Sequence, residues 1–109
     1  LAVSQDTVRA NLDRFADRLT LYKGWIPDRF HDVDHRQFSF VHVDVDLYQP
    51  TLDSAAFFYP RLQSGGVMVC DDYGSGYCPG AKRAFDEFFA DKPERGIALP
   101  TGQGVVIKQ

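Results

Sequence analysis

Residues 38–45 read FSFVHVDV and carry the strongest strand signal in the chain. A short segment that is apolar at nearly every position is typical of a parallel strand covered on both faces. A helical pattern follows, which begins at Pro50 and is expected to reach about Leu62. Its predicted buried positions are Leu52, Ala55, Ala56, Tyr59 and Leu62. Gly65-Gly66 is expected to end this helix before a second buried strand, VMVC, at residues 67–70.

The C-terminal part continues the alternation of helices and strands. Pro79 is expected to open a helix, and its apolar face carries Ala81, Ala84, Phe85, Phe88 and Phe89. Residues 97–99 and 105–107 flank the turn PTGQG, which predicts an antiparallel pair of strands. Together with the crossover before them, these elements predict an α/β fold.

The N-terminal part predicts one helix and one short strand. Ser4 or Asp6 is a suitable cap for a helix, and its apolar positions are Val8, Leu12, Phe15 and Leu19. The segment LTLY at residues 19–22 then reads as a strand that Gly24 ends. We find no linker or repeat, so residues 1–109 are expected to form a single domain.

Composition excludes several classes of function. The chain of 109 residues has 12 Lys and Arg against 15 Asp and Glu, a net charge of −3, and it has no basic run that would attract nucleic acid. No apolar run approaches the ~20 residues that a membrane span needs. Cys70 and Cys78 lack the spacing of a zinc site or a disulfide scaffold. No signal peptide is evident. We therefore expect a cytoplasmic protein with no nucleic-acid or membrane partner.

Acidic residues follow both buried strands at the point where each strand ends. Asp44-Val45-Asp46 closes the first strand, and Asp71-Asp72 closes the second. Neighbouring parallel strands lie about 4.8 Å apart, and their carboxyl ends form the rim where open α/β sheets bind ligands. We therefore expect Asp44 and Asp71 to lie close together.

Four carboxylates crowded at one rim repel one another unless they take up protons or bind a cation. A site made only of carboxylate oxygens suits Mg²⁺, or else Mn²⁺ or Ca²⁺, better than Zn²⁺. An aspartate at the end of a strand also commonly caps the next turn, and that interpretation is sufficient for either pair alone. The occurrence of both pairs, separated by one helix, favours a metal site.

The segments FVHVDVDLYQPT (residues 40–51) and FFYPRLQSGGVMVCDDYG (residues 57–74) resemble the macrocin O-methyltransferase (TylF/NovP-like) family. The resemblance implies a Mg²⁺-dependent enzyme that transfers a methyl group from S-adenosylmethionine to a sugar hydroxyl of an antibiotic. It also implies that Asp44, Asp71 and Asp72 are the metal ligands and that Asp46 is the general base.

The resemblance further implies a class I methyltransferase fold of which this chain contains only the C-terminal portion. The glycine-rich cofactor loop and the first two strands of that fold have no counterpart here. In the family's sheet order, the two absent strands lie in the middle, between residues 19–22 and residues 38–45. We therefore expect a partial Rossmann-like sheet in which residues 38–45 form an exposed edge. An apolar edge invites pairing, either with a second copy in a homodimer or with residues 19–22.

Other residues near the predicted rim allow two interpretations each. Tyr48, Tyr73 and Tyr77 flank the carboxylates and either form aromatic walls for a sugar or pack over the rim. His42 lies on the same strand face as Asp44 and either assists the site or is a buried histidine bonded to backbone, which we favour.

Gly24 and Trp25 lie near the position where the family binds adenine. They are candidate contacts to the cofactor, although Trp25 fits the role of a core anchor better.

Three functions are compatible with these residues. The first is the methyltransferase. The second is a glycosyltransferase in which Asp44-Val45-Asp46 binds Mn²⁺ and a nucleotide-sugar, but Asp71-Asp72 on the next strand favours the first. The third is a non-catalytic remnant that binds metal without turnover, since half of the cofactor site is missing.

Overall fold

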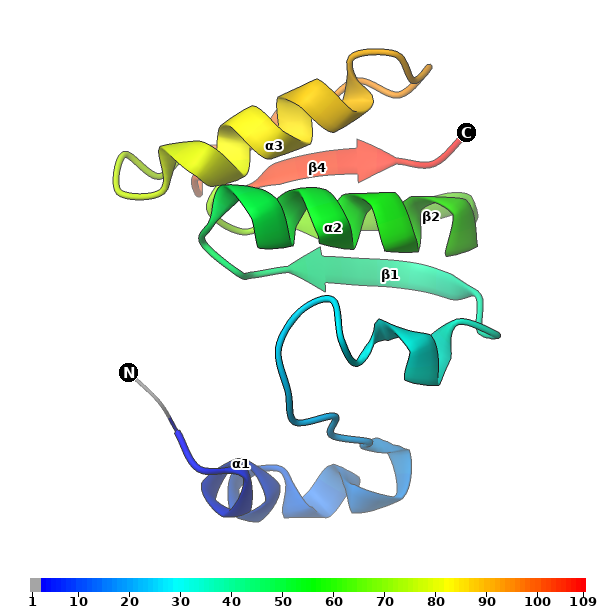
Figure 1. The fold of residues 1–109 in the computed structure, drawn as a ribbon, viewed down its shortest axis with the longest axis vertical. Helices are drawn as coiled ribbons and strands as arrows, with labels where there is room; N and C mark the ends of the chain where they lie inside the picture. The colour runs from blue at the N-terminus through cyan, green and yellow to red at the C-terminus, as the bar shows by residue number, and fades with distance from the viewer. Residues whose placement is uncertain (1–2) are drawn as a thin grey trace.

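The computed structural model describes residues 3–109 and shows a small α/β fold (Figure 1). Its helices are α1 (Gln5–Asn11), α2 (Tyr48–Phe58) and α3 (Pro79–Phe89), and its strands are β1 (Phe38–Val43), β2 (Leu62–Cys70), β3 (Ile97–Ala98) and β4 (Gly104–Ile107). Short 3₁₀ turns occur at Asp13–Arg18, Phe30–Val33 and Tyr59–Arg61. The sheet order is β1-β2-β4-β3, with β1 parallel to β2 and the other pairs antiparallel. The predicted α/β class and the C-terminal antiparallel pair are therefore confirmed.

The core lies between the sheet and helices α2 and α3, which cover the same face of it (Figure 1). The apolar stripe of α3 is buried as predicted, except that Phe88 is only half-buried. The buried core residues are Val41, Val43, Ala55, Leu62, Met68, Cys70, Ala81, Phe85, Phe89 and Val106. Phe85, at 1% exposure, is the largest fully buried side chain among the described residues.

Strand β1 is covered on one face only, contrary to the prediction. Side chains alternate between the two faces of a strand, and the face opposite α2 carries Phe40, which is 59% exposed, and the exposed His42. Continuous apolarity is therefore not a sign of double coverage in this strand. As expected, β1 is the edge of the sheet.

Helix α2 is shorter than predicted, and the strand after it is longer. The helix ends at Phe58, and Tyr59–Arg61 continue as a 3₁₀ turn because Pro60 has no N–H group to extend the helical ladder. Gly65 and Gly66 lie inside β2, where Gly65 has a φ of +81° and the pairing with β1 shifts register.

The buried face of α2 includes Ala55 as predicted, but it differs from the prediction at other positions. Ala56 is exposed, whereas Thr51 and Ser54 are buried. Their hydroxyl groups each donate at 2.7 Å to a backbone carbonyl four residues earlier, so their polar atoms are satisfied in the interior.

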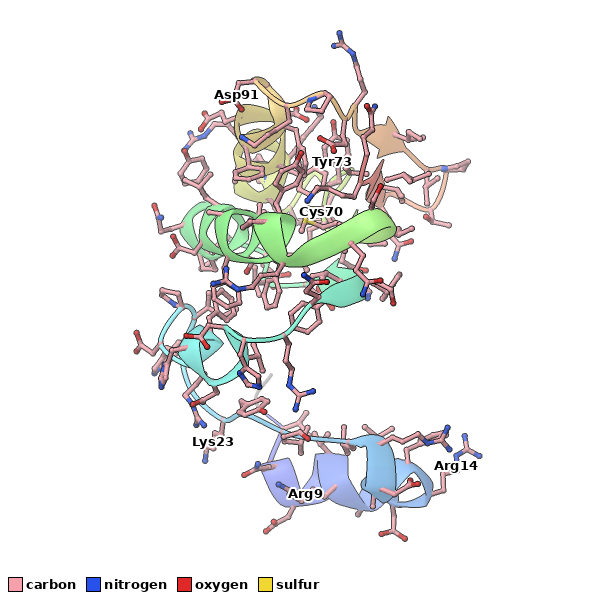
Figure 2. The ribbon with its side chains drawn as sticks, turned by 90° about the vertical axis from the view of Figure 1, so that its right-hand side faces the viewer. Arg9, Arg14, Lys23, Cys70, Tyr73 and Asp91 are labelled. Atoms are coloured by element: carbon pink, nitrogen blue, oxygen red, sulfur yellow. The ribbon has the colours of Figure 1, made fainter. Side chains whose placement is uncertain are left out.

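The N-terminal segment stands apart from the sheet (Figures 1 and 2). Helix α1 ends at Asn11 and buries no residue, and residues 19–22 form no strand. The prediction of a strand there, and of its pairing with β1, is wrong: a strand needs a partner backbone for its hydrogen bonds, and in the structure none lies beside these residues. Within residues 3–109, no helix has the length and apolarity required to cross a membrane.

Candidate functional site

The ends of β1 and β2 bring three predicted carboxylates together. Val43 of β1 is in register with Cys70 of β2, and the N–H of Asp71 donates to the carbonyl of Val43 at 2.9 Å. Asp44, Asp71 and Asp72 each present an oxygen, and these three oxygens lie within 4.8 Å of one another. The pairing of the strands thus creates one position from which a single cation can contact all three residues.

Asp46 reaches the same site through a strained turn. Its φ is +63°, in the left-handed region that residues other than glycine seldom adopt, and the N–H of Leu47 donates to the carbonyl of Val45 at 2.6 Å across it. Ligand atoms of Asp46, Asp72 and Cys78 lie within 4.8 Å of one another. Asp46 therefore lies beside the set of three carboxylates without being part of it.

Cys78 was not predicted at the site. It is half-buried and precedes the first residue of α3. The only signal in the sequence was the adjacent Pro79, which predicts the start of a helix but not the direction in which the residue before it points.

Two side chains hold Asp71. The Nε2 atom of His42 lies 3.0 Å from Oδ1 of Asp71, and the Nε2 amide of Gln103 donates to the same oxygen at 3.0 Å. The favoured interpretation of His42 as a buried histidine is wrong, because its side chain is 41% exposed and bonds a carboxylate. Gln103 lies 32 residues from Asp71 in the chain, so no local pattern pointed to it.

The crowding of the carboxylates changes their proton affinity. Partial burial raises the pKa of Asp72 to about 6, and its contact with Asp46 and the charges of Asp44 and Asp71 act in the same direction. Burial, followed by the charge of Asp71, also raises the pKa of Asp44. Hydrogen bonds from Gln103 and His42 lower the pKa of Asp71.

No lysine or arginine forms an ion pair with these four carboxylates within residues 3–109. A divalent cation would offset the repulsion between these carboxylates, which adds to burial in raising the pKa values of Asp72 and Asp44. The donor set, which consists of carboxylate oxygens, fits Mg²⁺. Asp44, Asp71 and Asp72 present the three clustered oxygens that a cation at this position would contact.

The three tyrosines near the rim differ in their surroundings. The hydroxyl of Tyr48 donates to Glu87, and that of Tyr73 donates to Asp86 at 2.6 Å, so both are tied to α3. Tyr77 is 98% exposed. Of the three, Tyr77 is the one whose side chain is open to solvent.

Gly24 and Trp25 lie on the segment between α1 and β1. Figure 2 shows the neighbouring Lys23 in the lower part of the molecule, apart from Cys70 and Tyr73. Trp25 is 85% exposed, so the interpretation of this residue as a core anchor is wrong. Gly24 has a φ of +154°, and a Cβ there would come within 2.7 Å of Cγ of Arg29, which explains why glycine occupies this position.

Comparison with known proteins relates this chain to one family of enzymes. The profile of the family described as Macrocin-O-methyltransferase (TylF) matches residues 1–102. Demethyldecarbamoylnovobiocin O-methyltransferase of Streptomyces niveus is 33% identical over 93 residues, which are 83% of this chain and 35% of that enzyme. Mycinamicin III 3''-O-methyltransferase of Micromonospora griseorubida is 30% identical over 91 residues, 81% of this chain and 35% of that enzyme.

Solved structures agree with this relationship. The O-methyltransferase NovP superposes with a TM-score of 0.76 at 30% identity, over 100% of this chain and 46% of its own. An O-methyltransferase from Bacillus cereus in complex with SAH has a TM-score of 0.73 over 98% of this chain and 60% of its own, but its 18% identity shows the fold alone. The chain spans about a third of the length of the curated relatives it matches.

The partial Rossmann-like fold is therefore that of O-methyltransferases. The resemblance noted in residues 40–51 and 57–74 is confirmed over most of the chain, and the protein belongs to the macrocin O-methyltransferase family.

Proposed function

We propose that this chain is the metal-binding and base-carrying portion of a Mg²⁺-dependent O-methyltransferase that uses S-adenosylmethionine. The observation that carries the proposal is the convergence of Asp44, Asp71 and Asp72 within 4.8 Å, with Asp46 beside them. Bound Mg²⁺ would supply Lewis acidity that lowers the pKa of a substrate hydroxyl. Asp46, which is not among the three proposed ligands, accepts the hydroxyl proton. The hydroxyl oxygen bonds to the donor's methyl carbon as the carbon–sulfur bond breaks, leaving a neutral thioether.

The acceptor we propose is a hydroxyl of a glycosylated metabolite. Two relatives are named for such reactions. The enzyme of Micromonospora griseorubida is named for O-methylation of mycinamicin III, and one of Streptomyces olivaceus is named for O-methylation of a rhamnosyl tetracenomycin. Tyr77, with its exposed ring, is the strongest candidate for an aromatic contact to a sugar, and Tyr48 and Tyr73 would line the inner side of the rim.

The cofactor site would be shared between this chain and other polypeptide. Gly24 and Trp25 are its proposed contributors from this chain, and we propose that the remaining contacts come from the part of the methyltransferase fold that these 109 residues do not contain. We further propose that residues 1–109 form the C-terminal part of one class I domain and act in the cytoplasm, where the free thiols of Cys70 and Cys78 would stay reduced.

Mg²⁺ is expected to stabilise the chain, and to do so more strongly as the pH rises from 5 to 7. The raised pKa of Asp72, about 6, means that the folded metal-free chain binds this proton more tightly than the unfolded chain. The free energy of unfolding of the metal-free chain therefore falls as the pH rises from about 4 through 6. Over this range Asp72 loses its proton in the unfolded chain before it does so in the folded chain. Mg²⁺ competes with the same proton, so its affinity gains up to about tenfold per pH unit below the pKa. Thermal unfolding with Mg²⁺ or with a chelator, at several pH values, measures both trends.

The same experiment separates the candidate enzymes. Stabilisation by a UDP-sugar with Mn²⁺, combined with no response to Mg²⁺ and S-adenosylmethionine, would support the glycosyltransferase instead. A Mg²⁺ effect that does not change between pH 5 and 7 would contradict the assignment of Asp72 as a ligand.

We also propose that, in the 109-residue chain by itself, the free edge of β1 pairs with a second copy. β1 ends the sheet, and Phe40 on its open face is 59% exposed. Phe40→Lys is expected to shift a dimer to monomer, because a charged side chain discourages pairing at an edge strand. Size-exclusion chromatography with light scattering measures the mass. A wild-type chain that stays monomeric at every concentration tested rejects the homodimer.

A further inference from the structure

We propose that His42 and Gln103 are positioning residues that jointly hold one oxygen of Asp71, so that its other oxygen faces the cation. The inference rests on the proposed function, since it concerns the metal site that the function requires. Neither residue is among the proposed ligands, and each acts through Asp71.

The two contacts converge on a single atom. Nε2 of His42 and Nε2 of Gln103 each lie 3.0 Å from Oδ1 of Asp71. A carboxylate oxygen has two lone pairs, so two donors saturate Oδ1 and leave Oδ2 as the oxygen free to bind metal. Outer partners of this kind orient metal ligands and restrict their rotation.

The sheet delivers the two donors from opposite sides of Asp71. His42 lies on β1, whose partner β2 ends immediately before Asp71. On the other side, Cys70 is paired with Gly104 of β4, so Gln103 stands opposite Asp71 at the next position of the antiparallel register. Strand pairing thus places His42, whereas Gln103 lies in the turn one residue before the paired Gly104.

The turn that carries Gln103 is tied to the rim at several points. The N–H of Gly74 donates to the carbonyl of Gly102 at 2.6 Å, and the N–H of Leu99 donates to the carbonyl of Gln103 at 2.8 Å. A Cβ at Gly104 would lie 2.5 Å from Cγ of Tyr73, so this close approach of β4 to the rim requires glycine. These contacts limit the positions that the Gln103 side chain can adopt, which favours a fixed role over an incidental surface contact.

The test is the Mg²⁺ affinity of the 109-residue chain, measured by calorimetric titration. Gln103→Met and His42→Phe keep the approximate shape of each side chain but remove the donor. Each is expected to weaken Mg²⁺ binding about tenfold, in the range seen for partners of metal ligands. His42→Gln restores an Nε2 donor of similar reach and is expected to bind within about threefold of wild type.

Matched controls separate positioning from a general structural effect. Gln49 donates to Asp53 at 2.9 Å away from the site, and His35 lies by Asp34 at 3.8 Å, so Gln49→Met and His35→Phe repeat the same changes elsewhere. Both controls are expected to keep wild-type affinity. Thermal unfolding in the presence of a chelator checks that each variant folds. A merely structural role of His42 or Gln103 would lower the unfolding temperature without changing the affinity for Mg²⁺.

Each result decides the inference. Normal Mg²⁺ affinity in both Gln103→Met and His42→Phe overturns the positioning role and leaves the proposed function standing. Failure of His42→Gln to recover affinity overturns the role of His42 as a donor. A wild-type chain that binds no Mg²⁺ overturns the metal site and the positioning role together.

Discussion

Asp46→Asn is expected to abolish methyl transfer while leaving Mg²⁺ affinity within about threefold of wild type. Removal of a general base typically costs about 10²–10⁴-fold in rate. Asparagine keeps the size of the side chain and tolerates the left-handed backbone at this position, where φ is +63°. Because Asp46 lies beside Asp72 but outside the set of three proposed ligands, the metal should still bind.

Turnover is measured in a chimera in which this chain replaces the matching segment of the Streptomyces niveus relative, with demethyldecarbamoylnovobiocin as acceptor. Metal affinity is measured on the chain itself. Asp71→Asn is the contrasting variant: it removes charge from a proposed ligand and is expected to weaken Mg²⁺ binding by at least about tenfold.

Equal losses of Mg²⁺ affinity in Asp46→Asn and Asp71→Asn would falsify the assignment of Asp46 as the base. If the wild-type chimera binds Mg²⁺ but does not turn over, the result favours a remnant that retains the metal site without catalysis.

Phe85→Ala is expected to lower the free energy of unfolding by about 3–5 kcal/mol, the usual cost of truncating a buried phenylalanine. Phe85 is 1% exposed, and its ring lies 4.8 Å from that of Phe89 and 5.8 Å from that of Tyr73, measured between centroids. A domain is stable by only about 5–15 kcal/mol, so this loss removes a large share of the free energy of unfolding.

Urea denaturation followed by circular dichroism measures the change. The matched control is Phe15→Ala, which truncates an exposed phenylalanine in the 3₁₀ turn Asp13–Arg18. This control is expected to change stability by no more than about 0.5 kcal/mol. Similar losses in both variants would show that the N-terminal segment packs as closely as the core between the sheet and α3.

Much of the sheet and the central geometry of the site followed from local patterns. The apolar stripe of α3 reports burial directly, because burial on one side of a helix imposes its period on the sequence. A right-handed crossover then places the ends of β1 and β2 side by side. For this reason, the proximity of Asp44 and Asp71 could be predicted from the sequence alone.

Other features depended on contacts between parts of the chain that are distant in sequence. The apolar pattern of residues 19–22 predicts a strand, but a strand forms only where another backbone supplies hydrogen bonds, and here none does. The coverage of β1 also depended on distant parts of the chain. Its residues suit burial on both faces, but α2 and α3 cover only one face of the sheet.

The sequence alone therefore determined the α/β class, the two parallel strands and the carboxylates at their ends, since these depend on periodicity and on the handedness of one crossover. Only the tertiary structure decided that Gln103 and His42 meet on one oxygen of Asp71 and that a left-handed turn brings Asp46 to Asp72. The physical reason is that hydrogen bonds between side chains depend on strand register and turn geometry to within an ångström, and no local pattern of apolar and polar residues encodes distances that finely.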